Sequence, residues 1–221
     1  MVYEGRLEAG KVLASELRAQ LGPCVVAGIP RGGMIVAGPI ALLLGAPLTV
    51  VHTRKLSSPQ APEYAFGAMD EDGQAVLDYR SVVTLGLGEP EVERIKAVTA
   101  GTIARRIGLY PGPRLCDLLP GRTAVLVDDG LATGLTMQAA IGYAQRHGAE
   151  ATVVAVPCAS ERAAYEMKSL LQREGDLFVC PEIRSDFGAV GDYYRDFGQV
   201  ADEDVVDLLR RAGALHPRPS S

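Results

Sequence analysis

Two adjacent carboxylates follow an apolar run in the middle of the chain. Residues 123–127 read TAVLV, and Asp128 and Asp129 come next, before the small, hydroxyl-bearing turn GLATGLT. Where such a turn opens a helix, its free backbone N–H groups suit a phosphate dianion. The two carboxylates would repel that phosphate, so they need sugar hydroxyl groups or a metal ion instead. A sugar phosphate satisfies both halves of the segment.

Other interpretations of this segment make different demands on its residues. A P-loop requires Lys before the final Ser or Thr, and Leu135 stands there. A haloacid-dehalogenase-like phosphatase needs two Asp residues separated by one position, whereas Asp128 and Asp129 are adjacent. A plain strand-to-helix turn with Thr133 as the helix N-cap would need no ligand at all.

Two more apolar runs are followed by groups that can bind anions. After CVVAG at 24–28 comes IPRGG, in which a Gly-Gly turn exposes N–H groups and Arg31 can grip an anion with two hydrogen bonds. After residues 48–52 come Arg54 and Lys55. The alternatives are an ordinary glycine turn beside a solvated Arg31, and a solvated pair of surface charges.

The segment VLVDDGLATGLT resembles the phosphoribosyl-pyrophosphate (PRPP) signature of type I phosphoribosyltransferases. The resemblance implies that Asp128 and Asp129 bind the ribose hydroxyls. It also implies that the 5′-phosphate lies against Ala132, Thr133, Gly134, Leu135 and Thr136. IPRGG matches the family's pyrophosphate loop, and Arg54 and Lys55 match the basic residue at the start of its mobile catalytic loop. These matches imply that pyrophosphate binds at Arg31, Gly32, Gly33 and Lys55.

The same resemblance implies the chemistry and the cofactor. The expected reaction transfers the phosphoribosyl group of PRPP to a nitrogen acceptor, a nucleobase, and releases pyrophosphate. Mg²⁺ would be bound through PRPP, with Asp128 and Asp129 as further ligands, and the catalytic set would be Asp128, Asp129, Lys55 and Arg31. Relatives that use 6-oxopurines usually carry Asp at the position of Ala132, so a hypoxanthine–guanine activity is disfavoured, with xanthine and guanine left open.

The resemblance also predicts features of the backbone. Members of the family often hold a non-proline cis peptide in the pyrophosphate loop, so we expect an unusual backbone at Pro30–Arg31 or Arg31–Gly32. Residues 55–66, which are polar and carry two prolines, are predicted to form a mobile loop that opens at Lys55 and closes over the reaction. Asp128 and Asp129 have no evident structural partner in the sequence.

An aromatic segment near the C-terminus is the candidate acceptor hood. Residues 181–199 hold Phe187, Tyr193 and Tyr194 in a chain with only 5% aromatic residues, beside Asp192 and Asp196. These rings could stack on a base whose edge the acids read. The alternative is a small hydrophobic cluster that fixes the C-terminal helix.

A non-catalytic PRPP or nucleotide sensor on the same fold is the alternative function. Such regulators usually keep the acid pair and add a nucleic-acid-binding surface. Arg31, Lys55 and the mobile loop favour an enzyme, because a sensor does not need leaving-group chemistry.

Alternating strands and helices must position all these groups. Helices are predicted at 6–20, 34–44, 89–107, 135–147, 160–172 and 202–212. Strands are predicted at 24–28, 48–52, 123–127, 152–156 and 177–180, with a hairpin formed by 65–70 and 75–79. Short apolar strands alternating with helices predict an α/β fold, a doubly wound, mostly parallel sheet with helices on both faces. We expect a single domain over 1–221, with its core at about 20–160 and its hood at about 176–221.

Composition narrows the class of protein. The 221 residues are 48% hydrophobic and 22% charged, which excludes disorder as the main state. Acidic residues number 27 against 22 basic ones, and the absence of a basic cluster disfavours nucleic acid as a partner. The four cysteines lack a CxxC pair, so neither a disulfide framework nor a zinc site is expected. With no targeting segment or membrane span predicted, we expect a cytoplasmic homodimer that binds PRPP and a small acceptor.

Overall fold

A five-stranded parallel sheet forms the centre of the protein in this computed structural model, which describes residues 2–17 and 21–215. The strand order is β2-β1-β6-β7-β9, so the chain reverses its direction of winding between β1 and β6. Ligands of open α/β sheets bind at such a switch point, beyond the carboxyl ends of the strands. The strands are β1 (Cys24–Gly28), β2 (Leu48–Val50), β6 (Thr123–Val127), β7 (Thr152–Ala155) and β9 (Leu177–Val179).

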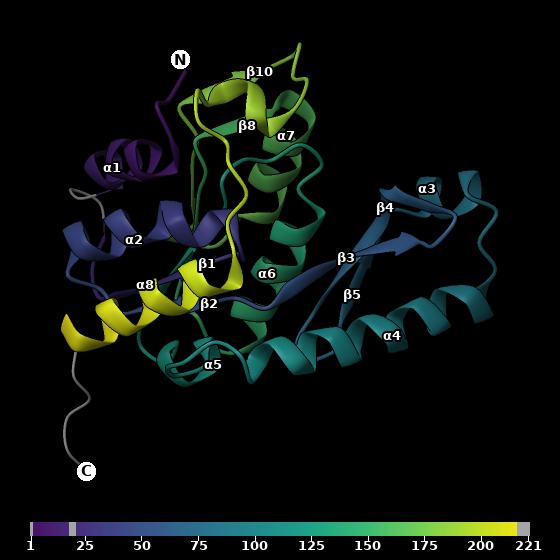
Figure 1. Ribbon diagram of the computed structural model, residues 1–221, viewed down its shortest axis with the longest axis horizontal. Coiled ribbons are helices and arrows are strands. Elements are labelled where there is room, and N and C mark those ends of the chain that lie inside the picture. Colours follow the sequence, from purple (N-terminus) through teal and green to yellow (C-terminus); the bar gives the residue numbers. More distant parts are fainter. Residues whose placement is uncertain (1, 18–20, 216–221) are drawn as a thin grey trace.

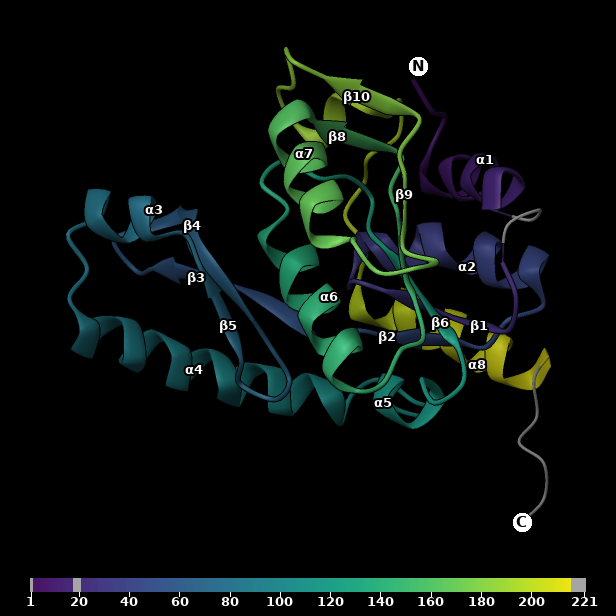
Figure 2. The same cartoon turned by 180° about the vertical axis from the view of Figure 1, so that it is seen from behind.

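Helices cover both faces of this sheet, so the predicted doubly wound fold is confirmed (Figures 1 and 2). Alternate residues of β1 point to opposite faces: Val26 joins the core beneath one helical layer, and Val25 joins the core beneath the other. No helix within the described residues is long and apolar enough to span a bilayer. One layer is α1 (Arg6–Leu17), α2 (Gly32–Leu44) and α8 (Asp202–Leu215), and the other is α5 (Leu115–Leu118), α6 (Leu135–Arg146) and α7 (Glu161–Leu170).

A second sheet projects from the body as an arm, which we define as residues 53–107 (Figure 1). Three antiparallel strands, β3 (Thr53–Ser58), β4 (Ala61–Asp70) and β5 (Ala75–Leu77), form this sheet. The helices α3 (Tyr79–Thr84) and α4 (Glu89–Ile107) complete the arm, and α4 packs along the sheet. The predicted hairpin and the predicted bounds of the 89–107 helix are confirmed.

The predicted loop at residues 55–66 is wrong, because this segment forms β3 and the start of β4. Leu56 and Phe66 are fully buried in a cluster with Ile95 and Ile103 of α4. These contacts join residues about 40 positions apart, so no local period in the sequence reveals them. Pro59 stands in the connection between the strands and Pro62 near the start of β4, where the missing N–H is tolerated.

Smaller differences concern the ends of elements. The helix predicted at 6–20 is present over Arg6–Leu17, and residues 18–20 lie outside the described residues. The strand predicted at 48–52 is shorter, because the chain enters the arm at Thr53. The prediction also missed α3, α5 and a small parallel pair, β8 (Cys158–Ser160) with β10 (Glu182–Arg184). All four cysteines are free thiols.

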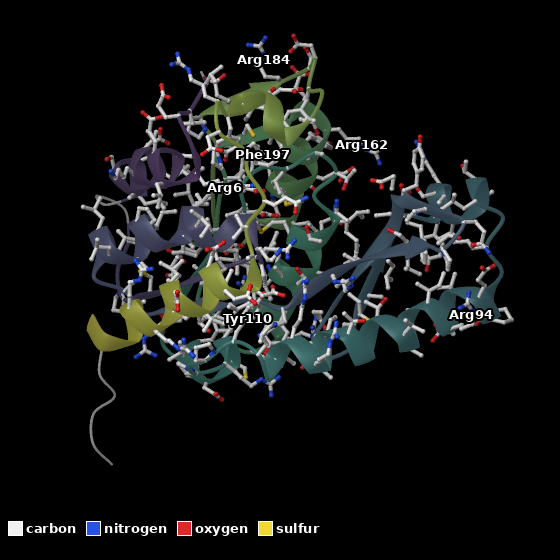
Figure 3. All side chains as sticks on the ribbon, viewed as in Figure 1. Arg6, Arg94, Tyr110, Arg162, Arg184 and Phe197 are labelled. Atoms are coloured by element: carbon white, nitrogen blue, oxygen red, sulfur yellow. The ribbon has the colours of Figure 1, made fainter. Side chains whose placement is uncertain are left out.

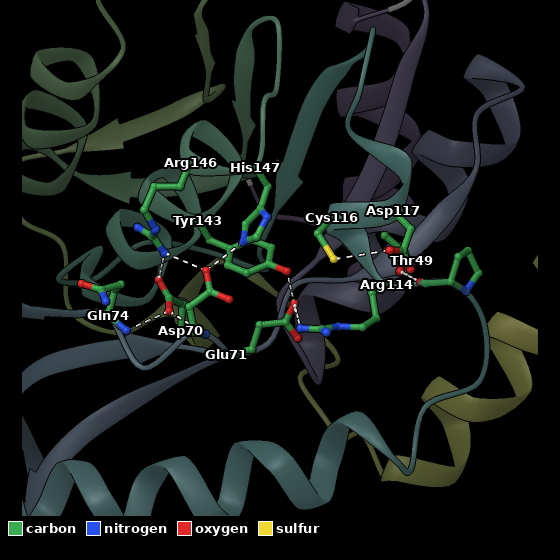
Figure 4. Close-up of polar contacts among 12 residues, drawn as sticks. Thr49, Asp70, Glu71, Gln74, Arg114, Cys116, Asp117, Tyr143, Arg146 and His147 are labelled. Carbon is green, nitrogen blue, oxygen red and sulfur yellow. Dashed lines mark hydrogen bonds and ion pairs between the residues drawn. The ribbon is translucent and has the colours of Figure 1, made fainter.

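The turn between β4 and β5 anchors the base of the arm to the body (Figure 4). Asp70 accepts backbone N–H hydrogen bonds from Asp72 and Gln74, which close the turn, and its second oxygen pairs with Arg146 at the end of α6. The next residue, Glu71, accepts a hydrogen bond from the hydroxyl of Tyr143 and pairs with Arg114 at 3.2 Å. The arm is therefore tied to α6 by charged side chains that are only 1–2% exposed on the turn side.

Candidate active site

The acid pair and the glycine turn meet at the switch point of the sheet. Asp128 and Asp129 follow β6, and Ile29 to Gly33 follow the neighbouring strand β1. A hydrogen bond of 2.8 Å from the Ile29 N–H to the Val127 carbonyl extends the pairing of these strands to their last residues. Two segments about 100 residues apart in sequence therefore lie side by side.

Close packing explains why glycines follow Arg31. A Cβ atom on Gly33 would lie 2.7 Å from the Val127 oxygen and 2.8 Å from Cα of Asp128. A Cβ on Gly32 would lie 1.9 Å from Oδ2 of Asp129. Any side chain at either position would displace the acids. The Pro30–Arg31 peptide bond is cis, as the resemblance predicts.

The two carboxylates differ in their electrostatic surroundings. Asp128 accepts a 2.9 Å hydrogen bond from the backbone N–H of Asp129. Loss of solvation and the charge of Asp129 raise the pKa of Asp128 well above its ordinary value, and Lys55 partly opposes this rise. A cation or hydroxyl groups arriving beside Asp128 would therefore favour its ionised form.

The expectation that the acids lack a structural partner is wrong for Asp129. Arg6, from the start of α1, places its Nε atom 2.8 Å from Oδ2 of Asp129. Both side chains are largely buried, with 11% and 17% of their surface exposed. Arg6 is separated from Asp129 by 123 positions, and nothing in the local sequence around either residue indicates the pair.

A cavity of about 710 Å³ opens in front of the acids, between the body and the arm. Its volume is within the ordinary range of small-molecule sites. Six of the residues predicted to act in the site line it: Arg31, Gly32, Lys55, Asp128, Asp129 and Thr136. Gly33 is not among the lining residues and is buried against Val127 and Asp128.

The arm adds two cationic groups that the sequence did not predict, Arg94 and Arg106. Arg94 and Arg106 of α4 line the cavity with Arg54 of β3, beside the hydroxyls of Thr99 and Thr102. The pKa of Arg54 is lowered by burial and by the charges of Arg106 and Arg105. The spacing of Thr99, Thr102 and Arg106 on one helical face was a usable signal, but its direction depends on how the arm folds.

Unpaired cations in this cavity are the clearest electrostatic feature of the site. None of the ion pairs found in residues 2–17 and 21–215 involves Arg31, Arg54, Lys55 or Arg106. The chain as a whole carries a net charge of −5, so this local excess runs against its composition. Like charges held together without counterions are stabilised by a bound anion.

The predicted phosphate turn opens α6 as expected, but its residues face two cavities. Helix α6 begins at Leu135 after Gly134, whose φ of 74° is the left-handed region that favours glycine. The first N–H groups of a helix have no partner within it, so they are free to bind an anion. Thr136 lines the main cavity, whereas Ala132, Thr133 and Leu135 line a second one of about 650 Å³ between the arm and α7.

The hood aromatics separate into two groups. Phe187 and Tyr193 stack on each other with ring centroids 5.0 Å apart, and neither lines the main cavity. Tyr194 is 6% exposed, packs against Tyr3 and donates a 2.6 Å hydrogen bond to the backbone oxygen of Asp129. These contacts favour the packing role for Tyr194 over direct stacking on an acceptor.

Fold and site together define a phosphoribosyltransferase-like α/β protein, and comparison with known proteins agrees. The chain belongs to the phosphoribosyl transferase domain family, whose model matches residues 4–197. Two relatives from Mycobacterium tuberculosis, Rv0571c of strain H37Rv and MT0597 of strain CDC 1551, are each named "Putative phosphoribosyl transferase". Each is 39% identical over 212 residues, which are 96% of this chain and 47% of the relative. The chain therefore spans about half the length of these relatives.

Solved structures show the same fold. The TT1426 protein from Thermus thermophilus is 38% identical and superposes with a TM-score of 0.75, covering 96% of this chain and 99% of that one. The AQ2163 protein from Aquifex aeolicus, at 13% identity and a TM-score of 0.52, covers 92% of this chain and 83% of its own. The second likeness concerns the fold alone.

Proposed function

We propose that the protein transfers the 5-phosphoribosyl group of PRPP to a nitrogen acceptor, a nucleobase, and releases pyrophosphate. The observation that carries this proposal is the composition of one cavity. The acid pair Asp128–Asp129 lines it together with Arg31, Lys55 and Thr136, so groups for the ribose, the leaving group and the 5′-phosphate face a common space. Family membership supports the same reaction class.

The ribose would bind at the acids. Carboxylate oxygens accept hydrogen bonds from vicinal hydroxyls, and a neutral diol adds no charge to a pair that already repels itself. The 5′-phosphate would bind at the start of α6, where free N–H groups and the hydroxyl of Thr136 meet the positive end of the helix dipole. These two anchors fix the ribose at both ends.

The leaving pyrophosphate would bind among the cations. Breaking the C1–oxygen bond leaves positive charge on the ribose ring and transfers the bonding electrons to pyrophosphate, as in other glycosyl transfers. Arg31 of the body and Lys55 of the arm line the cavity and would bind the departing pyrophosphate. Arg54 and Arg106 line the same cavity, and we include them among the proposed pyrophosphate-binding residues. Cations already in place stabilise developing negative charge without reorganisation.

Mg²⁺ fits this donor set as an ion carried by the substrate. The described residues contain no group of three or more His, Cys, Asp and Glu side chains that could hold a metal. Asp128 nevertheless has an uncompensated carboxylate beside Asp129, and Mg²⁺ characteristically binds one or two carboxylates plus phosphate oxygens. Bound there, the ion would neutralise charge on pyrophosphate and ribose oxygens.

The test is pyrophosphate release from labelled PRPP with a panel of nucleobases. Wild-type protein should release pyrophosphate with at least one base above the hydrolysis seen without a base. The Asp128→Asn, Asp129→Asn double variant is the control for contaminating enzymes and should show no release. Tight PRPP binding with no release for any base would replace this proposal with the sensor function. Absence of PRPP binding would reject both.

A further inference from the structure

Arg6 connects the acid pair to the C-terminal hood through three contacts. Figure 3 shows Arg6 close to Phe197 of the hood. Its Nε donates to Oδ2 of Asp129 at 2.8 Å, and its Nη1 donates to the backbone oxygen of Gly198 at 2.9 Å. Its guanidinium lies 3.9 Å from the centroid of the Phe197 ring, which is a close cation–π contact. One side chain from the start of the chain thus touches both the ribose acid and the hood.

The hood returns to the same acid through Tyr194. The Tyr194 hydroxyl donates to the backbone oxygen of Asp129, and the Tyr194 ring stacks on Phe197 with centroids 5.1 Å apart. Arg6, Asp129, Tyr194 and Phe197 therefore form a closed ring of contacts, which we call the Arg6 cluster. Asp129 is held at its carboxylate by Arg6 and at its backbone by Tyr194.

Arg6 reaches Asp129 without entering the cavity. Asp129 and Gly32 are among the cavity-lining residues, and Arg6 is not. Gly32 leaves the necessary room, because a Cβ atom there would lie only 2.8 Å from Nε of Arg6. Arg6 consequently binds Oδ2 of Asp129 while Asp129 still lines the cavity, in a region where a charged hydrogen bond is poorly screened.

We propose that Arg6 is a positioning residue for ribose recognition and that the Arg6 cluster couples the ribose site to the hood. This inference rests on the proposed function. Arg6 holds the Asp129 carboxylate in one orientation through the 2.8 Å contact, so the hydroxyls of PRPP meet a preorganised carboxylate. Phe197 and Gly198 belong to the hood, so an ordered hood should raise the affinity for PRPP. By the same coupling, bound PRPP should order the hood.

The first test separates ribose recognition from anion binding. Arg6→Gln should weaken PRPP binding by about 10- to 100-fold, as removal of an outer-shell partner typically does, while pyrophosphate affinity stays within about twofold. Arg6→Lys, which keeps the charge, should recover part of the PRPP affinity. The matched control is Arg195→Gln, which removes an exposed cation paired with Glu4 nearby, and both affinities should be unchanged.

Titration calorimetry with PRPP and with pyrophosphate, each with Mg²⁺, measures these affinities. Unchanged PRPP affinity in Arg6→Gln would overturn the inference. Equal losses for PRPP and pyrophosphate, or no difference between Arg6→Lys and Arg6→Gln, would show a merely structural role and overturn it too. Wild-type protein that fails to bind PRPP would reject the proposed function itself, which distinguishes the two failures.

The second test addresses the coupling to the hood. Phe197 is 38% exposed, so Phe197→Ala should be tolerated by the fold. It should weaken PRPP binding in the same direction as Arg6→Gln but less. If the cluster acts as a unit, the double variant binds PRPP no more weakly than Arg6→Gln alone. Additive losses, or an unchanged affinity in Phe197→Ala, would remove the hood from the proposal.

Discussion

Asp70 and Arg146 form an ion pair with Nη2 and Oδ2 2.5 Å apart, which ties the base of the arm to the end of α6 (Figure 4). The pair has one solvated member: 1% of the Asp70 side chain is exposed, against 40% of Arg146. Asp70 also closes the β4–β5 turn through two backbone N–H groups. The position of Lys55 and Arg54 relative to the acid pair therefore depends on a contact outside the cavity.

Asp70→Ala should destabilise the protein by about 2 kcal/mol, since two turn N–H groups lose their acceptor and the ion pair is broken. We place the value below that of a fully buried pair because Arg146 can turn to solvent. Asp72→Ala is the matched control: its side chain is 32% exposed, and its loss should cost about 1 kcal/mol or less. Urea unfolding measures both, and equal costs would contradict the anchoring role.

Arg106→Gln should weaken pyrophosphate binding by roughly tenfold, because it removes one charged hydrogen-bond donor from the cavity. Arg105→Gln changes the same charge on the neighbouring residue, whose side chain is exposed and does not line the cavity. It should weaken binding by about twofold or less through long-range attraction. Calorimetry with pyrophosphate compares the two variants. Similar losses of pyrophosphate affinity would show that Arg106 acts through long-range electrostatic attraction and makes no direct contact with pyrophosphate.

Lys55→Ala should lower turnover much more than PRPP affinity. The Lys55 side chain is exposed on β3. Its positive charge would stabilise the negative charge that develops on pyrophosphate in the transition state. Single-turnover kinetics measures the chemical step, and calorimetry measures the affinity. A variant with full activity, or one that loses only affinity, would make Lys55 a bystander.

The two acids should respond differently to neutralisation. Asp128→Asn relieves repulsion at a carboxylate whose pKa is raised, so it should leave the free energy of unfolding unchanged or increase it. Asp129→Asn leaves Arg6 without its partner and should destabilise the protein by about 1–2 kcal/mol. Both variants should lose PRPP binding. Thermal melts with calorimetry check this, and equal stability changes would contradict the pairing of Asp129 with Arg6.

Stability should fall as the pH is lowered from about 6.5 to 4. His52 stacks on Tyr110, and burial with the charges of Arg114 and Arg106 lowers the pKa of His52 to about 4. In this window the unfolded chain takes up a proton that the folded protein does not, so stability changes by at most about 1.4 kcal/mol per pH unit. Urea unfolding across this range should show a smaller slope for His52→Gln, and an unchanged slope would assign the effect elsewhere.

The acid pair, the phosphate turn and the glycine turn could be predicted from the sequence, because the residues of each motif are adjacent along the chain. The apolar run before Asp128 fixes a buried strand, and the turn after it opens α6 at Leu135, as predicted. The IPRGG turn marks the end of a second strand, and the carboxyl ends of parallel strands lie at the same edge of the sheet. The sequence was therefore sufficient to predict that Arg31 and the acid pair lie at the same edge of the sheet, and they line one cavity.

Contacts between distant segments were decided only by the tertiary structure. Residues 55–66 look like a loop by composition, and they become strands because Leu56 and Phe66 bury against a helix about 40 residues away. Arg6 lies on a helix that gave no sign of a role, and its partner stands 123 positions later. Side-chain type and spacing report what a segment can bind, whereas the long-range partner of a charge depends on how the whole chain packs.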